Sequence, residues 1–113
     1  MNGKRQYELH AEVFAALANP MRHEIFHHIV EAPRTVSELA ELSGATRPNV
    51  SQHLSVLARH GLAVRRRAGG RTEWMASDPR MAEACSLVDQ VMSERLEGSL
   101  ASLKRKVVSD GTE

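Results

Sequence analysis

Histidines are the side chains of this sequence with the clearest capacity to hold a metal ion. The chain contains six of them in 113 residues, and His23 and His27 are four positions apart. In a helix, positions i and i+4 lie on one face, where two imidazoles can chelate a borderline metal ion. The pattern predicts a histidine-based site for Ni²⁺ or Zn²⁺, with the candidate ligands His10, His23, His27 and His28.

Nitrogen and oxygen atoms are the main donors available to such a site. Glu24 and Glu31 are near the histidine pair in sequence. Further potential donors, from a second copy of the chain, are Asp89, Glu94 and Cys85. A donor set that is rich in nitrogen and oxygen and poor in thiolate favours Ni²⁺ slightly over Zn²⁺. Solvent-facing histidines that hold no metal are the alternative interpretation, and the sequence leaves it open.

The segment after Thr46 has a polar outer surface without acidic residues. At 100° per residue, Val50, Leu54 and Leu57 share one sector of a helix, and the opposite side carries mainly small or hydrogen-bonding side chains. A solvated helix of average composition usually carries Glu and Lys there instead. The lack of carboxylates therefore indicates an anionic partner.

Arginines are concentrated directly after this segment. Five arginines and no acidic residue lie between Arg59 and Thr72, although the net charge of the whole chain is only +1. This local concentration is more informative than the global charge, because clustered basic side chains are the electrostatic footprint of nucleic-acid binding.

The acid-free segment belongs to a predicted pair of helices within residues 35–62. Thr35 and Glu38 have the spacing of a capping box that opens the first helix, and Gly44 ends it. Thr46 is the predicted N-cap of the second helix. The sequence thus predicts a helix, a short turn and a second helix.

Further predicted elements flank this pair. Helical spacing of apolar residues predicts one helix over Tyr7–Ala18 and another from Pro20 to about Glu31. Two short strand-like runs, Leu62–Arg67 and Arg71–Ala76, surround two glycines and predict a hairpin. From Arg80 onward a long apolar stripe of near-heptad spacing predicts a helix that packs against a second copy of the chain.

Length and composition limit the remaining possibilities. The chain fits one domain, which we place at residues 7–108, between a flexible arm at residues 1–6 and a frayed end at residues 109–113. The single cysteine, Cys85, favours a reducing compartment. No apolar run is long enough for a membrane span, and the first residues lack the apolar core of a signal peptide. We therefore expect a cytoplasmic protein without a membrane partner.

The order helix, helix, helix-turn-helix, arginine-rich hairpin and long helix resembles the ArsR/SmtB family of bacterial transcriptional regulators. The residues that carry the resemblance are Leu17–Arg22, Val36–Ala40, Pro48–Leu54 and Gly61–Leu62. The resemblance implies a mainly α winged helix-turn-helix fold with a small β-hairpin wing, in the order α-α-α-α-β-β-α. It also implies a homodimer, joined through the first and last helices, that acts as an effector-responsive repressor on a palindromic operator in double-stranded DNA.

On this sequence, the resemblance implies specific DNA contacts. The amides of Asn49 and Gln52 pair with adenine and Arg47 with guanine, while the hydroxyls hold phosphates or cap the helix. The hairpin arginines contact phosphates or the minor groove. His53 lies near the edge of the buried sector, so a structural role and a DNA contact are equally open. The full set of expected DNA-binding residues is Thr46, Arg47, Asn49, Ser51, Gln52, His53, Ser55, Arg65, Arg66, Arg67 and Arg71.

The usual sensor motifs of the family are missing from this sequence. Thr35, Ser37 and Ala40 stand where thiolate-type members have cysteines, and the predicted last helix contains no histidine. A single cysteine excludes a disulfide switch within one protomer. The histidines named above remain as sensor candidates, and a small-molecule effector is the alternative. The expected dimer interface is apolar and comprises Leu9, Val13, Met81, Cys85, Val88, Met92 and Leu96.

Two functions of other classes are weighed against DNA binding. A winged helix that serves as a protein-interaction module would have a wing without arginines and an acidic or apolar surface on the second helix of the helix-turn-helix pair. The sequence has neither feature. An enzyme is disfavoured, because the sequence has no glycine-rich phosphate cradle and no catalytic spacing of nucleophile and histidine.

Overall fold

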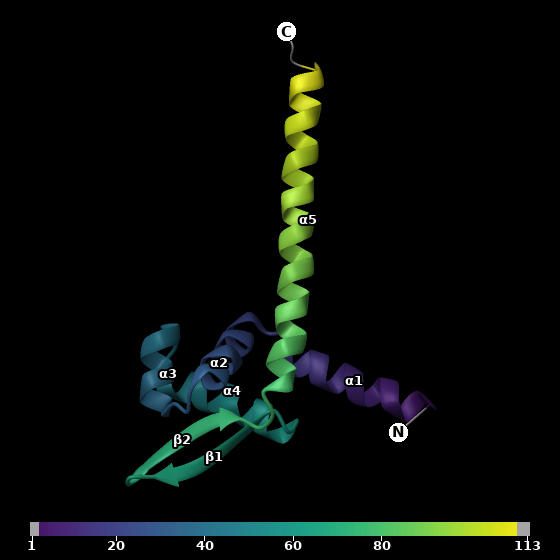
Figure 1. Ribbon diagram of the computed structural model, residues 1–113. Helices are drawn as coiled ribbons and strands as arrows, with labels where there is room; N and C mark the ends of the chain where they lie inside the picture. Colours follow the sequence, from purple (N-terminus) through teal and green to yellow (C-terminus); the bar gives the residue numbers. More distant parts are fainter. Residues whose placement is uncertain (1–2, 111–113) are drawn as a thin grey trace. The chain divides into compact units, whose positions relative to one another are not determined.

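The chain divides into two compact units, Met1–Pro79 and Arg80–Glu113. The structure is a computed structural model that describes residues 3–110, with side chains described up to residue 98. Within these residues the first unit contains four helices and a hairpin, and the second is one helix (Figure 1). The domain expected over residues 7–108 therefore spans both units.

The first helix, α1 (Gly3–Leu17), begins earlier than the sequence predicts. Apolar spacing predicts a start at Tyr7, whereas residues 3–6 already belong to the helix. Nη1 of Arg5 lies 3.4 Å from Oε2 of Glu8, one helical turn away, as expected for an ion pair on a helix. Of the arm expected at residues 1–6, residues 3–6 thus belong to a helix, and residues 1–2 lie outside the described part of the chain.

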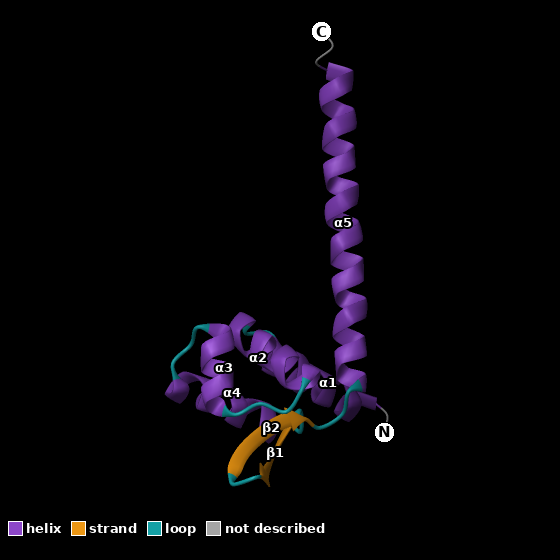
Figure 2. Ribbon diagram, turned by 60° about the vertical axis from the view of Figure 1, so that its left-hand side comes forward, coloured by secondary structure: helices purple, strands orange, loops and turns teal. Residues whose placement is uncertain are grey.

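Three more helices complete the helical part of this unit. They are α2 (Pro20–Glu31), α3 (Val36–Ser43) and α4 (Arg47–Arg59). Their boundaries agree with the predicted ones, and α3 and α4 are the predicted helix-turn-helix pair. Figure 2 shows α2, α3 and α4 grouped above the hairpin.

Side-chain caps determine where these helices begin. Asn19, Thr35 and Thr46 each accept a hydrogen bond from the backbone N–H three residues later, at 3.0, 3.1 and 3.3 Å. Glu38 completes the capping box of α3, because its carboxylate accepts the N–H of Thr35 at 2.7 Å. Gly44 ends α3 with a φ of 77°, a conformation that favours glycine.

The core of the first unit is formed mainly by α2, α3 and α4. The predicted inner sector of α4 is confirmed, since Val50, Leu54 and Leu57 are fully buried. At 20–33 cal/mol per Å² of apolar surface, each of these side chains contributes roughly 1.5–3 kcal/mol. The other fully buried large side chains are Ile25, Phe26, Ile29 and Leu39.

The hairpin, called the wing below, consists of β1 (Ala63–Ala68) and β2 (Arg71–Ala76) in antiparallel pairing. Gly69 and Gly70 connect the strands with φ values of 58° and 78°. Positive φ at both central residues is the requirement of a type I′ turn, whose twist matches that of the strands. The predicted hairpin is therefore confirmed.

Backbone hydrogen bonds fix the base of the wing to the helices. The N–H of Arg34, in the loop before α3, donates to the Trp74 carbonyl at 2.9 Å, and the N–H of Trp74 donates to the Arg34 carbonyl at 2.7 Å. The N–H of Ser77 donates to the carbonyl of Leu62 at 3.1 Å. The wing therefore has a defined position beside α3 and α4.

The second unit is the helix α5 (Arg80–Asp110). Its 31 residues correspond to a length of about 46 Å at 1.5 Å per residue. Ser109 and Asp110, where we expect a frayed end, are part of this helix. Residues 111–113 lie outside the described part of the chain.

The surface of α5 is unusually apolar for a single helix. Among its described side chains, the exposed large apolar ones are Leu87, Val88, Val91, Met92 and Leu96. In the described part of the chain, no helix has both the length and the apolar content for crossing a membrane.

Candidate nucleic-acid interface

The outward face of α4 carries the polar side chains that the sequence predicts to contact DNA. The sequence of α4 contains no acidic residue. Thr46 is exposed, and its hydroxyl caps the helix by accepting the N–H of Asn49. Exposed amides and guanidinium groups can form paired hydrogen bonds with base edges. The predicted residues of α4 that are exposed are Arg47, Asn49, Ser51, Gln52 and Ser55.

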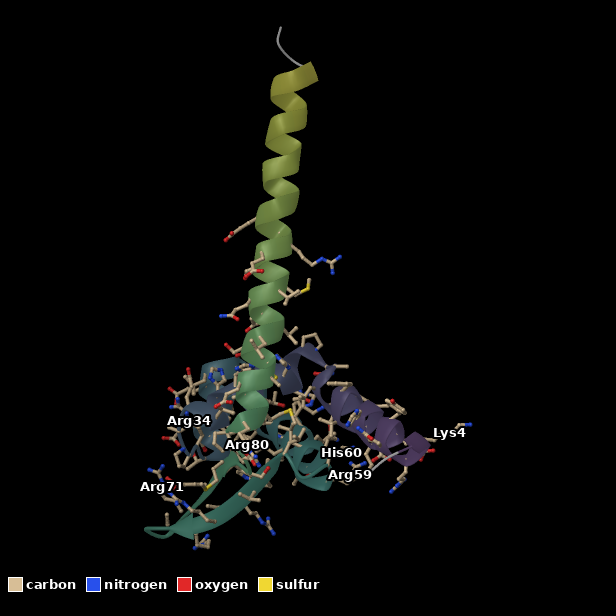
Figure 3. All side chains as sticks on the ribbon, turned by 45° about the vertical axis from the view of Figure 1, so that its right-hand side comes forward. Lys4, Arg34, Arg59, His60, Arg71 and Arg80 are labelled. Carbon is tan, nitrogen blue, oxygen red and sulfur yellow. The ribbon has the colours of Figure 1, made fainter. Side chains whose placement is uncertain are left out.

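Arg59 extends this polar face, and the sequence analysis missed it. Ser51, Ser55 and Arg59 follow one another at intervals of four residues, so they form a row along α4. Figure 3 labels Arg59 beside His60, at the end of this helix. The interval of four residues is the signal that identifies Arg59 in the sequence.

A shallow depression lies where α4 meets the wing. Its volume is about 470 Å³, and Arg59 and Arg65 both line it. Trp74 contributes to the same lining from β2, and the guanidinium carbon of Arg65 lies 6.0 Å from its ring centroid. Two guanidinium groups beside an aromatic ring form a site that suits a phosphate group. Trp74 is a second residue that sequence reasoning missed.

The four arginines of the wing do not have equivalent surroundings. The strand register pairs Arg65 with Trp74 and Arg66 with Glu73, and successive side chains of a strand face opposite sides. Arg66 is 3.5 Å from the carboxylate of Glu73. Arg71 contacts the same carboxylate at 3.2 Å. These two arginines are partly neutralised by ion pairs within the protein.

Arg65 and Arg67 lie on the other face of the wing. Both are exposed, and among the described residues neither has a carboxylate within 4.0 Å. Arg67 donates to the hydroxyl of Thr72 at 3.0 Å, which orients the guanidinium without neutralising it. Their positive charge therefore remains available to an anionic partner.

His53 makes a contact inside the protein. Its Nδ1 lies 3.4 Å from Nη1 of Arg22 on α2. Burial, and secondarily the positive charge of Arg22, lower the pKa of His53 below its ordinary value. A neutral imidazole can accept the guanidinium hydrogen at Nδ1. The sequence leaves two roles open for His53, a structural one and a DNA contact, and this contact with Arg22 favours the structural role.

Arg22 joins three helices through one guanidinium group. Its Nε donates to the carbonyl of Ala16 and its Nη2 to the carbonyl of Ala15 at 3.5 Å, both in the last turns of α1. The remaining nitrogen faces His53 on α4. Carbonyls at a helix end lack their usual partner within the helix, and Arg22 supplies one to Ala16, whereas the carbonyl of Ala15 also accepts the N–H of Ala18 at 3.2 Å. Arg22 thereby helps to hold α4 in place.

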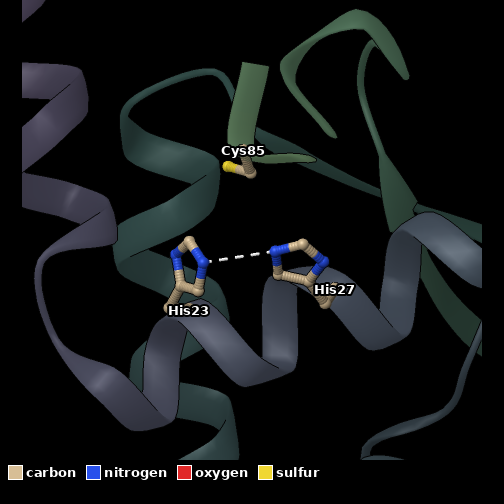
Figure 4. A group of neighbouring side chains, drawn as sticks. All are labelled: His23, His27 and Cys85. Carbon is tan, nitrogen blue, oxygen red and sulfur yellow. Dashed lines mark hydrogen bonds between the residues drawn. The ribbon is translucent and has the colours of Figure 1, made fainter. Parts of the chain in front are cut away.

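The four candidate metal ligands have different surroundings. Nε2 of His27 lies 3.2 Å from Nε2 of His23, one turn away on α2 (Figure 4). His28 is adjacent in sequence, but its Nε2 contacts the carboxylate of Glu24 at 3.1 Å. His10 belongs to another helix, α1. Of these four histidines, the structure brings the rings of His23 and His27 together.

Comparison with known proteins identifies the family. Residues 17–67 match a family described as a helix-turn-helix domain. The HTH-type transcriptional regulator Rv0081 of Mycobacterium tuberculosis is 34% identical over 105 residues, which cover 92% of each chain. A similar solved structure is the solution structure of Mb0332 from Mycobacterium bovis, a homodimeric winged helix-turn-helix DNA-binding domain and possible ArsR-family regulator. Its TM-score is 0.76 at 29% identity, and the alignment covers 86% of this chain and 93% of that one. The chain belongs to the ArsR/SmtB family.

Other solved structures share the fold of this ArsR/SmtB protein. The crystal structure of Rv0081 has a TM-score of 0.77 at 33% identity, and the alignment covers 87% of this chain and 99% of that chain. The NMR structure of the cadmium metal-sensor CmtR from Mycobacterium tuberculosis has a TM-score of 0.64 at 34% identity, over 73% and 85% of the two chains. The expected winged helix-turn-helix fold is confirmed, and the chain is a DNA-binding transcriptional regulator rather than an enzyme.

Proposed function

We propose that this ArsR/SmtB protein is an effector-responsive repressor that binds a palindromic operator in the cytoplasm. The supporting observation is that the acid-free face of α4 meets Arg65 of the wing in one depression, on the side of the wing where Arg65 and Arg67 keep their positive charge. A duplex presents base edges in its groove and phosphates at its rim. A hydrogen-bonding helix beside a cationic hairpin matches both.

The proposed contacts divide into base-reading and phosphate-binding ones. Arg47, Asn49 and Gln52 read base edges, because guanidinium and amide groups form paired hydrogen bonds with guanine and adenine. Ser51 and Ser55 bind phosphates together with the wing arginines. Arg65 and Arg67 contribute more to DNA affinity than Arg66 and Arg71, since the latter pair is engaged with carboxylates.

A homodimer is the proposed form on DNA. The helix α5 exposes a row formed by Val88, Met92 and Leu96, and a single helix cannot bury this row by itself. We place Met81 in the same interface, together with Leu9 and Val13 of α1, whereas Cys85 of the predicted set is already buried within the single chain and has little surface left for a partner. Two copies related by a twofold axis would present two α4 helices to successive major grooves, so the proposed operator is a palindrome with half-sites about one helical turn apart.

A divalent metal ion is the proposed effector, and a small molecule is the alternative. The relative CmtR is a cadmium metal-sensor. In this chain the proposed ligands are histidines, from the set His10, His23, His27 and His28, and the proposed ions are Ni²⁺ or Zn²⁺. Imidazole nitrogen suits these borderline ions.

DNase I footprinting on the DNA upstream of the chain's own gene tests the DNA-binding proposal. We expect a protected segment with twofold symmetry at moderate salt. Loss of protection is expected when Gln52→Ala is combined with Arg65→Ala, and retention with Gln90→Ala on α5. If no segment is protected at any salt concentration, the chain is better explained as a winged helix for protein interaction.

A further inference from the structure

We propose that His23 and His27 form a transition-metal site on α2 that takes Ni²⁺, Zn²⁺ or Cu²⁺ through two imidazole nitrogens. This inference rests on the proposed metal effector, and it assigns the site to one pair among the candidate histidines.

The distance between the two rings fits a shared metal ion. The two Nε2 atoms are 3.2 Å apart. An imidazole nitrogen binds Zn²⁺ at about 2.0–2.1 Å, so two such ligands are about 2.8 Å apart at a right angle and about 3.4 Å apart at a tetrahedral angle. The observed separation lies between these limits. Small ring adjustments therefore suffice to hold an ion between the two nitrogens.

The helix holds both imidazoles before any metal binds. His23 and His27 stand on consecutive turns of α2 with their rings 4.7 Å apart (Figure 4). The ring of Phe26 packs edge-on against His27 at 6.0 Å, and Phe26 itself is fully buried. Both histidines are half-buried. Since little side-chain freedom remains to be lost, the pair is prepared for chelation.

The spacing of this pair matches a known helical zinc-binding pattern. The segment from His23 to His27 reads His-Glu-x-x-His, in which two histidines on one helical face bind zinc. In zinc enzymes the intervening glutamate acts as a general base. Here the Glu24 carboxylate contacts His28 instead. The pattern therefore supplies the two nitrogen ligands in a regulator that is not an enzyme.

The other two candidate histidines have different partners. His28 lies between two carboxylates, at 3.1 Å from Glu24 and 3.6 Å from Glu31. His10 packs edge-on against Tyr7 of the same helix. Neither ring has its nitrogen close to a second imidazole nitrogen in the described part of the chain. His28 and His10 are therefore matched controls, with the same chemistry at positions outside the site.

Nitrogen ligands determine which ions the pair selects. Imidazole suits Zn²⁺, Ni²⁺ and Cu²⁺, with the highest affinity for Cu²⁺, whereas Mg²⁺, Ca²⁺ and Mn²⁺ prefer oxygen ligands. Soft ions such as Cd²⁺ favour thiolates. A site of two imidazoles therefore differs in selectivity from one built of several thiolates. Two imidazoles leave the remaining coordination positions to water or another donor.

Calorimetric titration of the tag-free full chain with Ni²⁺ and Zn²⁺ tests the assignment. We expect one ion per chain in the wild type, in His10→Gln and in His28→Gln. We expect loss of this binding in His23→Gln and in His27→Gln. Circular dichroism and the melting temperature of each variant establish that it is folded.

Nitrogen NMR of the imidazoles tests the same assignment in the wild-type chain, so the result does not depend on whether a variant folds. On addition of one equivalent of Zn²⁺ to the wild type, we expect the Nε2 signals of His23 and His27 to shift and those of His10 and His28 to stay in place. The assignment is overturned if none of Ni²⁺, Zn²⁺ and Cu²⁺ binds stoichiometrically. It is equally overturned if binding survives both His23→Gln and His27→Gln.

Operator affinity, measured on the same preparation with and without metal, separates this inference from the proposed function. Operator binding without stoichiometric metal binding overturns the metal site alone. Stoichiometric metal binding, with no operator binding in either the metal-free or the metal-loaded form, supports the site and overturns the repressor proposal.

Discussion

Arg71 of the wing reaches Glu38 in the first turn of α3, with 3.4 Å between Nη2 and Oε1. The same carboxylate oxygen accepts the N–H of Thr35 and closes the capping box. The hydrogen bond from the Thr35 backbone is the largest influence that lowers the pKa of Glu38, and Arg71 adds to it. One carboxylate therefore connects the wing with the helix pair, so Arg71 supports the fold.

The wing arginines are predicted to contribute unequally to DNA affinity. Replacing Arg65 and Arg67 by alanine should weaken operator binding. The slope of log K against log salt should fall by about 0.9 for each phosphate that the protein no longer neutralises. Fluorescence anisotropy at several salt concentrations measures both quantities.

The double variant Arg66→Ala, Arg71→Ala is the matched control for this prediction, and its melting temperature must first show that it stays folded without the contact of Arg71 with Glu38. It removes the same charge from the same hairpin, but these side chains are paired with Glu73. A smaller change in affinity and slope is therefore expected. Equal effects of the two double variants would contradict the assignment of roles to the two faces of the wing.

Gln52 is predicted to determine part of the operator sequence. Gln52→Ala should reduce discrimination at one base pair by about 1–3 kcal/mol and relax the preference there. The salt slope should stay unchanged, since Gln52 neutralises no phosphate. Affinities for operators with single base substitutions check this. Gln90→Ala on α5 is the control, and equal losses at every base pair would argue against base reading.

The stability of the fold is predicted to fall below about pH 6.5 because of His53. Its pKa is lowered in the folded state, so the unfolded chain binds the proton more readily there. The contribution of neutral His53 to the free energy of unfolding is complete above the ordinary histidine pKa of about 6.5. It is lost as the pH falls through the lower pKa of the folded state.

Urea unfolding at pH 7.5 and at pH 5.5 measures this contribution. The difference in free energy of unfolding between the two conditions should be smaller in His53→Gln than in the wild type. His60→Gln, at the C-cap of α4, is the matched control and should retain the wild-type difference. An unchanged difference in His53→Gln would show that the contact with Arg22 does not depend on the charge of the imidazole.

The apolar row of α5 is predicted to mediate dimerisation. Met92→Asp places a charge in the row between Val88 and Leu96, so it should shift the protein to monomer in sedimentation velocity and abolish tight operator binding. Gln90→Asp places the same charge on the opposite side of the helix and should leave the dimer intact. A dimer that survives Met92→Asp would place the interface elsewhere.

Local patterns predicted the elements of this fold because their causes are local. Asn19, Thr35 and Thr46 cap helices through contacts three residues away, and the apolar sector of α4 follows from helical periodicity. The start of α1 lies four residues before the predicted one, because residues 3–6 carry no apolar side chain whose spacing could indicate a helix.

The contacts of the site depended on tertiary structure and were less accessible to prediction. Arg71 and Glu38 are 33 positions apart, and Arg22 and His53 are 31 positions apart, so no local pattern pairs them. The division of the wing arginines follows from the strand register. The pairing of His23 with His27 was predictable, since it depends only on the geometry of one helix.

Competition between the operator and a scrambled duplex of equal length tests the central claim most directly. At about 0.15 M salt, a repressor of this kind should bind its footprinted operator on the order of 10³-fold or more tightly than the scrambled duplex. Gln52→Ala should reduce this ratio. Equal affinity for the two duplexes would contradict sequence-specific recognition by α4.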